Sequence, residues 1–505
     1  MKHCPNPECR YRQRHGTDAE YQDSATVCSD CGTALVEGGA SRPETQEKPS
    51  TPAAPKGAGP WGRLGVSILC SALLGLASFV PLPGSDDLMR NVHQTGLVGL
   101  SNLAARLSLM AIGFTPALSA YMIVELALLI VPAWRGLRLG GSESRRAPHR
   151  FVIGLSALLA FVQSVGIATW LRDLGGPGTV LMAVRPWVPW VAIVLLPLGT
   201  LVFAGLSAAI DRWGLGDGLS TLIVASSLPA IVSAIIETVL VRSSADENAG
   251  TGLVLLGVMI VGVVTGTVLA LNRQSLFRAT ADPFTIEIPP SGIGPLVLPS
   301  SLLALPASAA AIFGLQGFDL RNLGGFAYNI VVVVLVAALG VVLALLYNQP
   351  RRVAAVWFGK GASEAQVGAA RKQVAAAALR GTALLLAIAF LQYFVPTFFN
   401  VPFAIGFLVF IVATAVVLDL GKEWSFRRSH PGLSRVWPVH RVYAVQPALA
   451  ALSAAGIPAF PRGLHHRTLL QFFGPYVPIT LLVPAEKAED AERIVRERLV
   501  PELKQ

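Results

Sequence analysis

Charged residues are scarce in this chain: Asp, Glu, Lys and Arg make up 14% of its 505 residues, whereas 53% are hydrophobic. Soluble globular proteins carry about 25% charged residues, so this deficit argues against a water-soluble fold. The mean hydropathy is +0.58, and the apolar residues come in long blocks such as 193–206 and 330–346. The composition therefore predicts a protein whose solvent is the lipid bilayer.

Three further absences narrow the function. Residues 1–60 lack the apolar run of a cleavable signal peptide, so the first spanning helix is expected to direct insertion. No cluster of His, Asp and Glu and no nucleophile–base pair recurs within the apolar segments, so the chain is not expected to be an enzyme. The net charge of +10 comes without a basic stripe interleaved with aromatics, which argues against nucleic acid as a partner.

Ten segments are long and apolar enough to cross a bilayer. A helix rises about 1.5 Å per residue, so it needs about 20 mostly apolar residues to cross a hydrocarbon core about 30 Å thick. We therefore expect an all-α polytopic membrane protein with ten transmembrane helices, at residues 64–82, 108–131, 151–171, 187–209, 218–240, 251–271, 292–312, 327–347, 378–397 and 402–420.

The distribution of basic residues predicts the orientation of these helices. With a cytosolic N-terminus, the inner loops hold more than twice as many Lys and Arg residues as the outer loops. Such an excess marks the cytosolic side of a membrane protein. An even number of spans returns the chain to its starting side, so we expect both termini in the cytoplasm.

Seven short motifs follow one another along these segments in the order of one known family. They are PLPG (81–84), AIGFTPALSAYMIVEL (111–126), FVQSVGIA (161–168), RWGLGDGLSTLI (212–223), SGIGPLVLPSSLLALP (291–306), YNQPRRVA (347–354) and VPFAIGFLVFIVATAVVLD (401–419). Together they resemble SecY, the channel subunit of the bacterial protein-export translocon, over about residues 62–425. The resemblance implies two pseudo-symmetric five-helix halves around a pore, in a multi-pass protein of the bacterial plasma (inner) membrane.

The resemblance also implies a ring of bulky apolar side chains that seals the pore. A narrow apolar constriction dewets, so it blocks ions and still deforms around a passing peptide. Apolar residues dominate these helices in any case, so their presence at the ring positions is weak support on its own. Carried over residue by residue, the ring consists of Leu118, Met122, Leu219, Ile223, Val297 and Ile411.

A gate that opens sideways to lipid is implied between the second and seventh spans, with Glu125, Gln163 and Ser300 as its polar residues. Glu125 is open to two interpretations. A carboxylate at membrane depth is costly and therefore a functional candidate. Alternatively, it lies close enough to the cytosolic end of its helix for water to reach it, which is the interpretation we favour slightly.

Other segments depart from the family pattern. The loops that in the family dock the ribosome or the SecA motor are reduced, and their basic residues here are Arg273, Arg278, Arg351 and Arg352. We therefore expect a divergent paralogue that still conducts secreted or membrane polypeptides and docks SecA or the ribosome less well. SecE-like and SecG-like subunits are further expected partners. The alternative is a membrane scaffold or regulator that keeps the fold and conducts nothing.

The N-terminus carries Cys4, Cys9, Cys28 and Cys31, spaced as C-x4-C and C-x2-C. Two such knuckles supply four thiolates to a tetrahedral structural zinc ion, and Gly32 frees the backbone of the second. The first knuckle is longer than usual, so His3 or His15 could replace one ligand. Disulfides are the rival interpretation, which a reducing cytosol disfavours. We expect a zinc ribbon at 1–35, a disordered linker at 36–60 and the membrane domain at 61–428.

Residues 440–505 are expected to form a small α+β cytosolic domain that resembles a prokaryotic signal-transducing-like module. Strands are expected at 441–445, 457–460 and 477–483, and helices at 446–455 and 485–499. His465 and His466 fall in a loop between these elements. They could bind metal or phosphate, but histidines in exposed loops are usually incidental.

Overall fold

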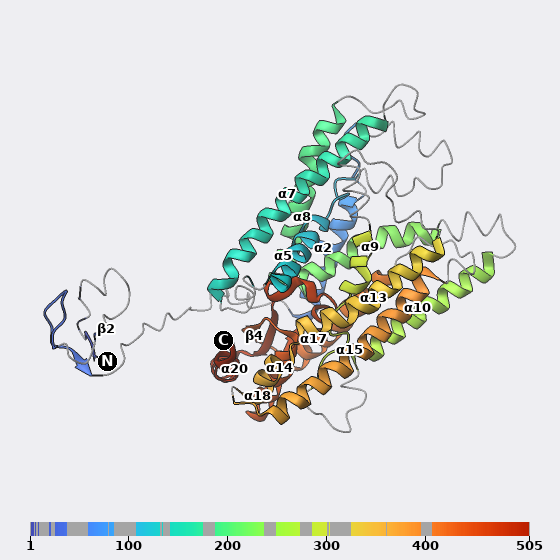
Figure 1. Ribbon diagram of the computed structural model, residues 1–505. Helices are drawn as coiled ribbons and strands as arrows, with labels where there is room; N and C mark the ends of the chain where they lie inside the picture. Colours follow the sequence, from blue (N-terminus) through green and yellow to red (C-terminus); the bar gives the residue numbers. More distant parts are fainter. Residues whose placement is uncertain are drawn as a thin grey trace. The chain divides into compact units, whose positions relative to one another are not determined.

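The computed structural model divides into two compact units, Met1–Ala53 and Ala54–Gln505, and each has a three-stranded sheet. Figure 1 draws the described residues as ribbons. These residues are 2–4, 6, 9, 20–21, 26–37, 59–78, 80–84, 108–131, 134, 142–174, 187–236, 249–272, 285–299, 302–303, 325–359, 361–394 and 407–503.

The first unit is built on three two-residue strands, β1 (Lys2–His3), β2 (Glu20–Tyr21) and β3 (Val36–Glu37), in the order β2-β1-β3. Strand β1 pairs antiparallel with both neighbours. A tight turn follows Cys28, whose carbonyl accepts from the Gly32 amide at 2.9 Å. Gly32 has a φ of +68°, which a residue with a side chain rarely adopts. Most of the expected linker, residues 38–58, lies outside the described part of the chain.

The second unit is mainly helical. Its long helices cover parts of nine of the ten expected spans, and of the seventh only 294–299 and 302–303 are described as helix. The long helices are α2 (Pro60–Ser78), α5 (Thr115–Ile130), α7 (Ser142–Leu174), α8 (Val188–Trp213), α9 (Gly218–Ile236), α10 (Ala249–Leu271), α13 (Gly325–Tyr347), α15 (Glu364–Tyr393) and α17 (Phe407–Ser429).

Five of the described helices are long and apolar enough to cross a membrane: α2, α8, α15 and the apolar stretches of α7 and α13. The expectation of several apolar helices is thus confirmed, and the count of ten stays a prediction. Helix α5 begins later than expected, at Thr115, because Gly113 adopts a φ of +51° and Pro116 occupies the first turn. Helix α15 begins earlier, because Ser363 and Gln366 form a capping box at its start.

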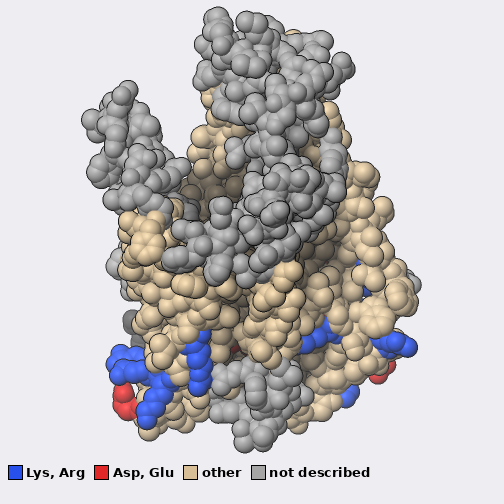
Figure 2. Space-filling model, turned by 90° about the vertical axis from the view of Figure 1, so that its right-hand side faces the viewer, with Lys and Arg blue, Asp and Glu red and all other residues tan. Residues whose placement is uncertain are grey.

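Large apolar side chains point outward from several of these helices. Val194 and Leu201 on α8 and Val334 on α13 each expose at least 60% of their surface. Helices that are apolar on every side are typical of membrane spans. On the face drawn in Figure 2, the described Lys and Arg side chains gather toward the lower end, where α14 (Pro350–Phe358), α18 (Val445–Ala454) and α20 (Ala488–Leu503) lie in Figure 1.

The C-terminal domain contains the sheet β4-β6-β5, in which β6 (Ile479–Pro484) pairs antiparallel with β4 (Leu433–Val439) and β5 (Phe460–Arg462). Helices α18 and α20 pack on it, and their buried side chains share a core with α14 and α15 through residues such as Val353, Trp357 and Val374. The C-terminal domain is therefore packed against the membrane helices along α14 and α15.

Two expectations for the C-terminal domain are wrong. The sheet starts at Leu433, ahead of residue 440, in a strand that the sequence conceals because Pro438 interrupts it at a bulge. Residues 441–445 are not a strand: they form the turn η5 (Val442–Ala444) and the start of α18. Their β-branched and aromatic residues are typical of strands, but Val442 to Val445 are all buried, and the Tyr443 carbonyl accepts from Trp357 Nε1 at 3.2 Å.

Candidate functional site

The expected ring residues converge. Leu118 and Met122 come from α5, Leu219 and Ile223 from the first turns of α9, and Ile411 from α17, and these five belong to one hydrophobic cluster. A cavity of about 130 Å³ adjoins this cluster. Its lining includes three of the six residues proposed for the ring, which are Leu118, Ile223 and Val297. The structure thus brings all six positions to one apolar centre between α5, α9, α17 and the start of the seventh span.

The other expected site residues are less closely grouped. Glu125 lies on α5 one turn beyond Met122, and Gln163 lies half-buried on α7. Ser300, Arg273 and Arg278 fall outside the described residues. Arg351 and Arg352 start α14, and Arg351 is exposed. Two of these four basic residues therefore lie where the C-terminal domain packs.

A segment of the C-terminal domain reaches the apolar centre, and the sequence interpretation missed it. This inserted segment, residues 463–477, contains α19 (Leu464–Leu469) and the turns η6 (Gln471–Tyr476). Four of its side chains, Leu469, Leu470, Phe472 and Phe473, are at most 5% exposed and belong to the same cluster as the ring. Leu470 and Phe472 also line the cavity beside Leu118 and Ile223. The run LLQFF, unusually apolar for a cytosolic tail, is the signal that could have revealed the segment.

The inserted segment contacts the membrane helices closely. The Phe473 ring meets the Tyr121 ring edge-on, with 5.2 Å between their centroids. The Ile293 amide, at the start of the seventh span, donates to the Leu469 carbonyl at 2.7 Å. A Cβ on Gly292 would lie 2.3 Å from that carbonyl oxygen, so the approach requires glycine there. Inside the segment, Arg467 is 2% exposed and donates to the carbonyls of Leu470, Gly474 and Val477.

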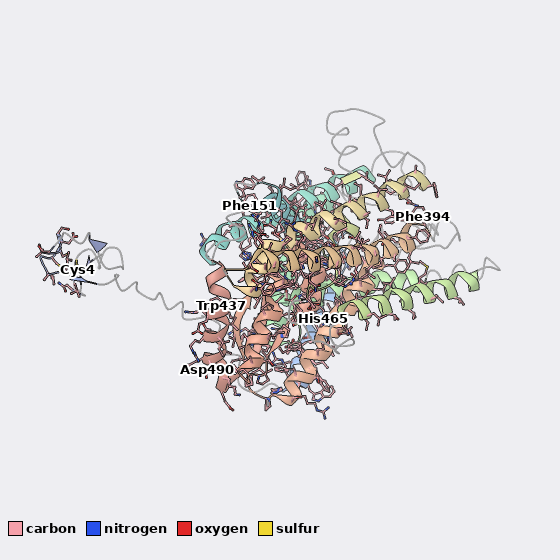
Figure 3. All side chains as sticks on the ribbon, turned by 60° about the horizontal axis from the view of Figure 1, so that its bottom comes forward. Cys4, Phe151, Phe394, Trp437, His465 and Asp490 are labelled. Carbon is pink, nitrogen blue, oxygen red and sulfur yellow. The ribbon has the colours of Figure 1, made fainter. Side chains whose placement is uncertain are left out.

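Asp419, two turns beyond Ile411 on α17, anchors the inserted segment. Its Oδ1 lies 2.5 Å from His465 Nδ1, and its Oδ2 lies 3.0 Å from His466 Nδ1. The same two oxygens accept from the backbone amides of His465 at 3.2 Å and His466 at 3.0 Å. One carboxylate thus holds two side chains and two amides, and we call Asp419, His465 and His466 the latch. Figure 3 labels His465 among the packed helices.

The two histidines have different second partners. Lys422 Nζ lies 3.0 Å from His465 Nε2, and an ammonium can only donate, so Nε2 accepts and Nδ1 carries the proton given to Asp419. His466 Nε2 lies 3.4 Å from an oxygen of Asp217, at the start of α9. Burial opposes the charged imidazole, but the carboxylates of Asp217 and Asp419 outweigh burial and raise the pKa of His466. His466 therefore favours the imidazolium, which ties α9 and α17 together through the segment.

A second buried ion group stands beside the latch. Glu423, one turn beyond Asp419 and 1% exposed, pairs with Arg462 of β5 at 3.3 Å and with Arg427 at 2.8 Å. Glu423 also accepts from the Gly216 amide at 3.0 Å, while Arg462 donates to the carbonyls of Asp211 and Gly216. Glu423 and Arg427 both come from α17, whereas Arg462 comes from the C-terminal domain. Charge complementarity therefore adds to the apolar contact.

Two interpretations from the sequence are wrong here. His465 and His466 are 8% and 2% exposed, so they are not incidental residues of an exposed loop. Glu125 is fully buried rather than reached by water. The cause is the inserted segment, because Gly474 packs against Glu125 so closely that a Cβ would lie 2.3 Å from its Oε2.

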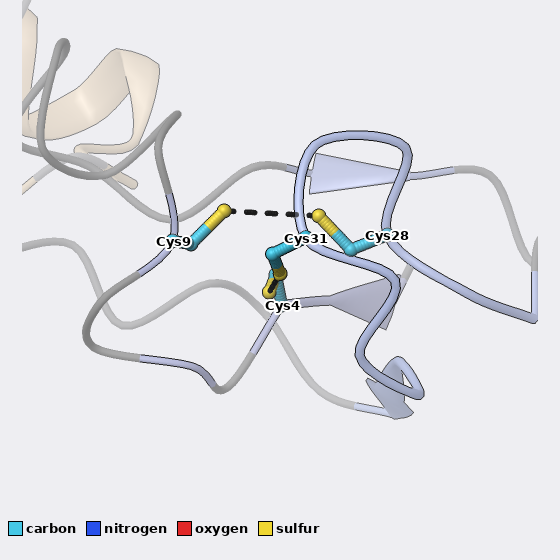
Figure 4. A group of neighbouring side chains, drawn as sticks. All are labelled: Cys4, Cys9, Cys28 and Cys31. Carbon is cyan, nitrogen blue, oxygen red and sulfur yellow. Dashed lines mark hydrogen bonds between the residues drawn. The ribbon is translucent and has the colours of Figure 1, made fainter.

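The four cysteines of the first unit gather as a separate cluster (Figure 4), and their sulfur atoms lie within 4.8 Å of one another. The Cys4–Cys31 and Cys9–Cys28 sulfur pairs are 3.5 and 3.7 Å apart. Tetrahedral zinc with Zn–S bonds of about 2.3 Å places its sulfurs about 3.8 Å apart, so this donor set fits the ion. Hydrogen bonds from Thr33 lower the pKa of Cys31 to about 6, which favours a ligating thiolate. The cluster is thus compatible with a metal site.

We expect the purified full-length protein to hold about one zinc ion per chain. Cys28→Ser removes one of four ligands and should abolish stoichiometric zinc, measured by elemental analysis after dialysis against a weak chelator. Cys70→Ser is the matched control, because Cys70 lies in α2 among apolar neighbours and should leave the zinc content unchanged. Equal zinc content in both variants would contradict the assignment.

Comparison with known proteins agrees with this arrangement. The SecY family model matches residues 108–420. The chain is similar to the protein translocase subunit SecY of Buchnera aphidicola subsp. Schizaphis graminum, with 22% identity over 277 residues, which are 50% of this chain and 63% of that protein. Its similarity to protein translocase subunit SecY of Escherichia coli strain K12 is 26% over 271 residues, 47% of this chain and 59% of that protein.

One solved structure, described as "The structure of a protein conducting channel", is 12% identical with a TM-score of 0.47, and the match covers 74% of this chain and 94% of that chain. The chain spans about three fifths of the length of the two curated relatives above. The family model, however, covers more than half of the chain, and its range includes all six proposed ring positions. The chain belongs to the SecY family.

Proposed function

We propose that this protein is a channel subunit that moves polypeptides across or into the bacterial plasma membrane. The observation that carries the proposal is the convergence of Leu118, Met122, Leu219, Ile223 and Ile411 in one apolar cluster with a cavity beside it. An apolar constriction of this kind excludes ions by dewetting and yields to a passing chain. SecY family members are channels rather than enzymes.

The finer organisation belongs to the same proposal. Ten spans in two five-helix halves would return the chain to its starting side, with both termini in the cytoplasm. The basic side chains that gather at the end occupied by the C-terminal domain support this orientation. We propose a zinc ribbon at 1–35, a linker at 36–60 and a cytosolic domain after 430. Glu125, Gln163 and Ser300 remain candidates for the lateral gate, and SecE-like and SecG-like subunits for partners.

Crosslinking tests the proposal. An export intermediate stalled in transit is expected to crosslink to cysteines placed at Leu118 and Ile223, because both line the cavity. A cysteine at Val194, 69% exposed on the outer face of α8, is the matched control and should capture lipid rather than polypeptide. Absence of captured chain at both ring positions, in the parent and in a variant with His465→Ala and His466→Ala, would overturn conduction.

The second candidate function is a non-conducting scaffold or regulator with the same fold. One observation favours it: α14, which carries Arg351 and Arg352, packs against the C-terminal domain. A helix engaged in this way is less available to an external motor or ribosome. The same crosslinking experiment separates the two candidates, because a scaffold captures no translocating chain at either ring position.

A further inference from the structure

We propose that residues 463–477 close the channel from the cytosolic side by occupying the place that a polypeptide in transit would take. This inference rests on the proposed function and adds its regulation. Besides the cavity, the segment is anchored at Asp419 in the C-terminal half of α17, at Asp217 before the start of α9 and against Glu125 in the C-terminal half of α5. Those helix ends lie on the side of the C-terminal domain, because α17 leads directly into β4.

The segment contacts the channel through both apolar side chains and its main chain, as a substrate segment would. Leu470 and Phe472 of the segment line the same cavity as the ring residues Leu118 and Ile223. The cavity has a volume of only about 130 Å³. The Leu469 carbonyl accepts from the Ile293 amide, a main-chain bond that any peptide could make. Leu470 and Phe472 have the apolar side chains that a hydrophobic substrate segment would place at the ring. Residues 463–477 of the chain therefore take the position of a substrate in the pore.

The attachments of the segment are suited to release. The cavity shows that its packing against the ring is incomplete, unlike an ordinary hydrophobic core. Its position is instead fixed by the latch, in which the Asp419 carboxylate holds His465 and His466 through four hydrogen bonds. Gly463, with a φ of +79°, stands at the start of the segment, and Val477 and Pro478 join its end to β6. Backbone changes at these two junctions would let the segment swing away while the sheet stays folded.

The latch is a buried charged group, and removing such a group from water is costly. It therefore fixes the position of the segment more than it stabilises the fold. Removing the latch should therefore shift the segment without unfolding the membrane helices. Arg467 keeps the shape of the segment through its three carbonyl partners, independently of Asp419. The segment can leave the ring as one folded piece.

The test uses the full-length protein in proteoliposomes with Ile223→Cys as a reporter. A membrane-impermeant maleimide should label this cysteine slowly in the latched chain, and at least about tenfold faster after His465→Ala with His466→Ala, because charged hydrogen bonds are lost. Labelling is read at that residue by mass spectrometry. Joining Tyr121→Cys to Phe473→Cys with a short thiol crosslinker should return the slow rate. Arg493→Ala, in an exposed ion pair of α20, is the control and should change nothing.

Equal labelling rates with and without the latch, in variants that elute and melt as the parent does, would overturn closure. The labelling requires no transport, so it is independent of the proposed function. A reporter that becomes accessible while no stalled chain is captured in the unlatched protein would overturn conduction and leave closure standing. Capture of a stalled chain in the parent, together with a labelling rate that the latch substitutions leave unchanged, would overturn closure and leave conduction standing.

Discussion

Asp419→Ala is expected to detach the inserted segment from α17 at a cost of about 3–5 kcal/mol, the range found when one member of a buried charge pair is removed. The substitution leaves the amides of His465 and His466 and two ring N–H groups without their acceptor in a region closed to water. It also leaves the His466 imidazolium with Asp217 alone. Hydrogen exchange at His465 and His466 should rise sharply, because their amides donate to this carboxylate.

Glu492→Ala provides the matched control for Asp419→Ala. Glu492 is also a carboxylate in an ion pair, with Arg496 at 3.4 Å, but both side chains are on the surface of α20. Exposed pairs contribute about 0–1 kcal/mol, so exchange in the inserted segment should not change. If hydrogen exchange in the inserted segment is the same in Asp419→Ala as in Glu492→Ala, the latch does not hold the segment in place.

Gly292→Ala is expected to have the second large effect, because the added Cβ would push the backbone of Leu469 and Gln471 away from the start of the seventh span. The added Cβ would lie 2.3 Å from the Leu469 carbonyl oxygen and 3.1 Å from the Gln471 amide nitrogen. Neither atom can rotate away as a side chain could, so the segment must move off the seventh span or the protein must carry the strain. Overpacking of this kind costs about 1–3 kcal/mol in addition to the strain of a positive φ. A lowered melting temperature and faster labelling at Ile223→Cys are the expected readouts.

Gly456→Ala separates backbone strain from the steric clash. Gly456 has a φ of +68°, close to the +63° of Gly292, but a Cβ there meets no atom within 4 Å. It should therefore show the cost of the conformation alone and leave labelling at Ile223→Cys slow. Identical behaviour of the two alanine variants would mean that close approach to Leu469 is unimportant.

The sequence predicted the long apolar helices well, for a physical reason. A span must be long and apolar whatever surrounds it, so α8 and α13 are evident from composition. Motif order then located Leu118 and Ile223, which the structure brings to one cavity. The helices and these two positions were both inferred from residues that are close together along the chain, and a single sequence contains that information.

The inserted segment could not be predicted in the same way. His465 and His466 gain their partner Asp419 only through tertiary contact, since two strands and a helix lie between them and Asp419 along the chain. The strand β4 was hidden by Pro438, and the turn η5 by residues that favour strands. In each case tertiary contacts, rather than the intrinsic secondary-structure propensity of the residue, determined the structure that forms.

The short connection between α17 and β4 has a consequence for how the channel could be controlled. Only residues 430–432 join the end of α17 at Ser429 to Leu433 of the sheet. A domain tethered so closely remains near its binding place after release, at an effective concentration on the order of millimolar. Re-closure would then be unimolecular and independent of protein abundance. A cytosolic factor that keeps the path open would have to outcompete this local concentration, or bind the domain itself.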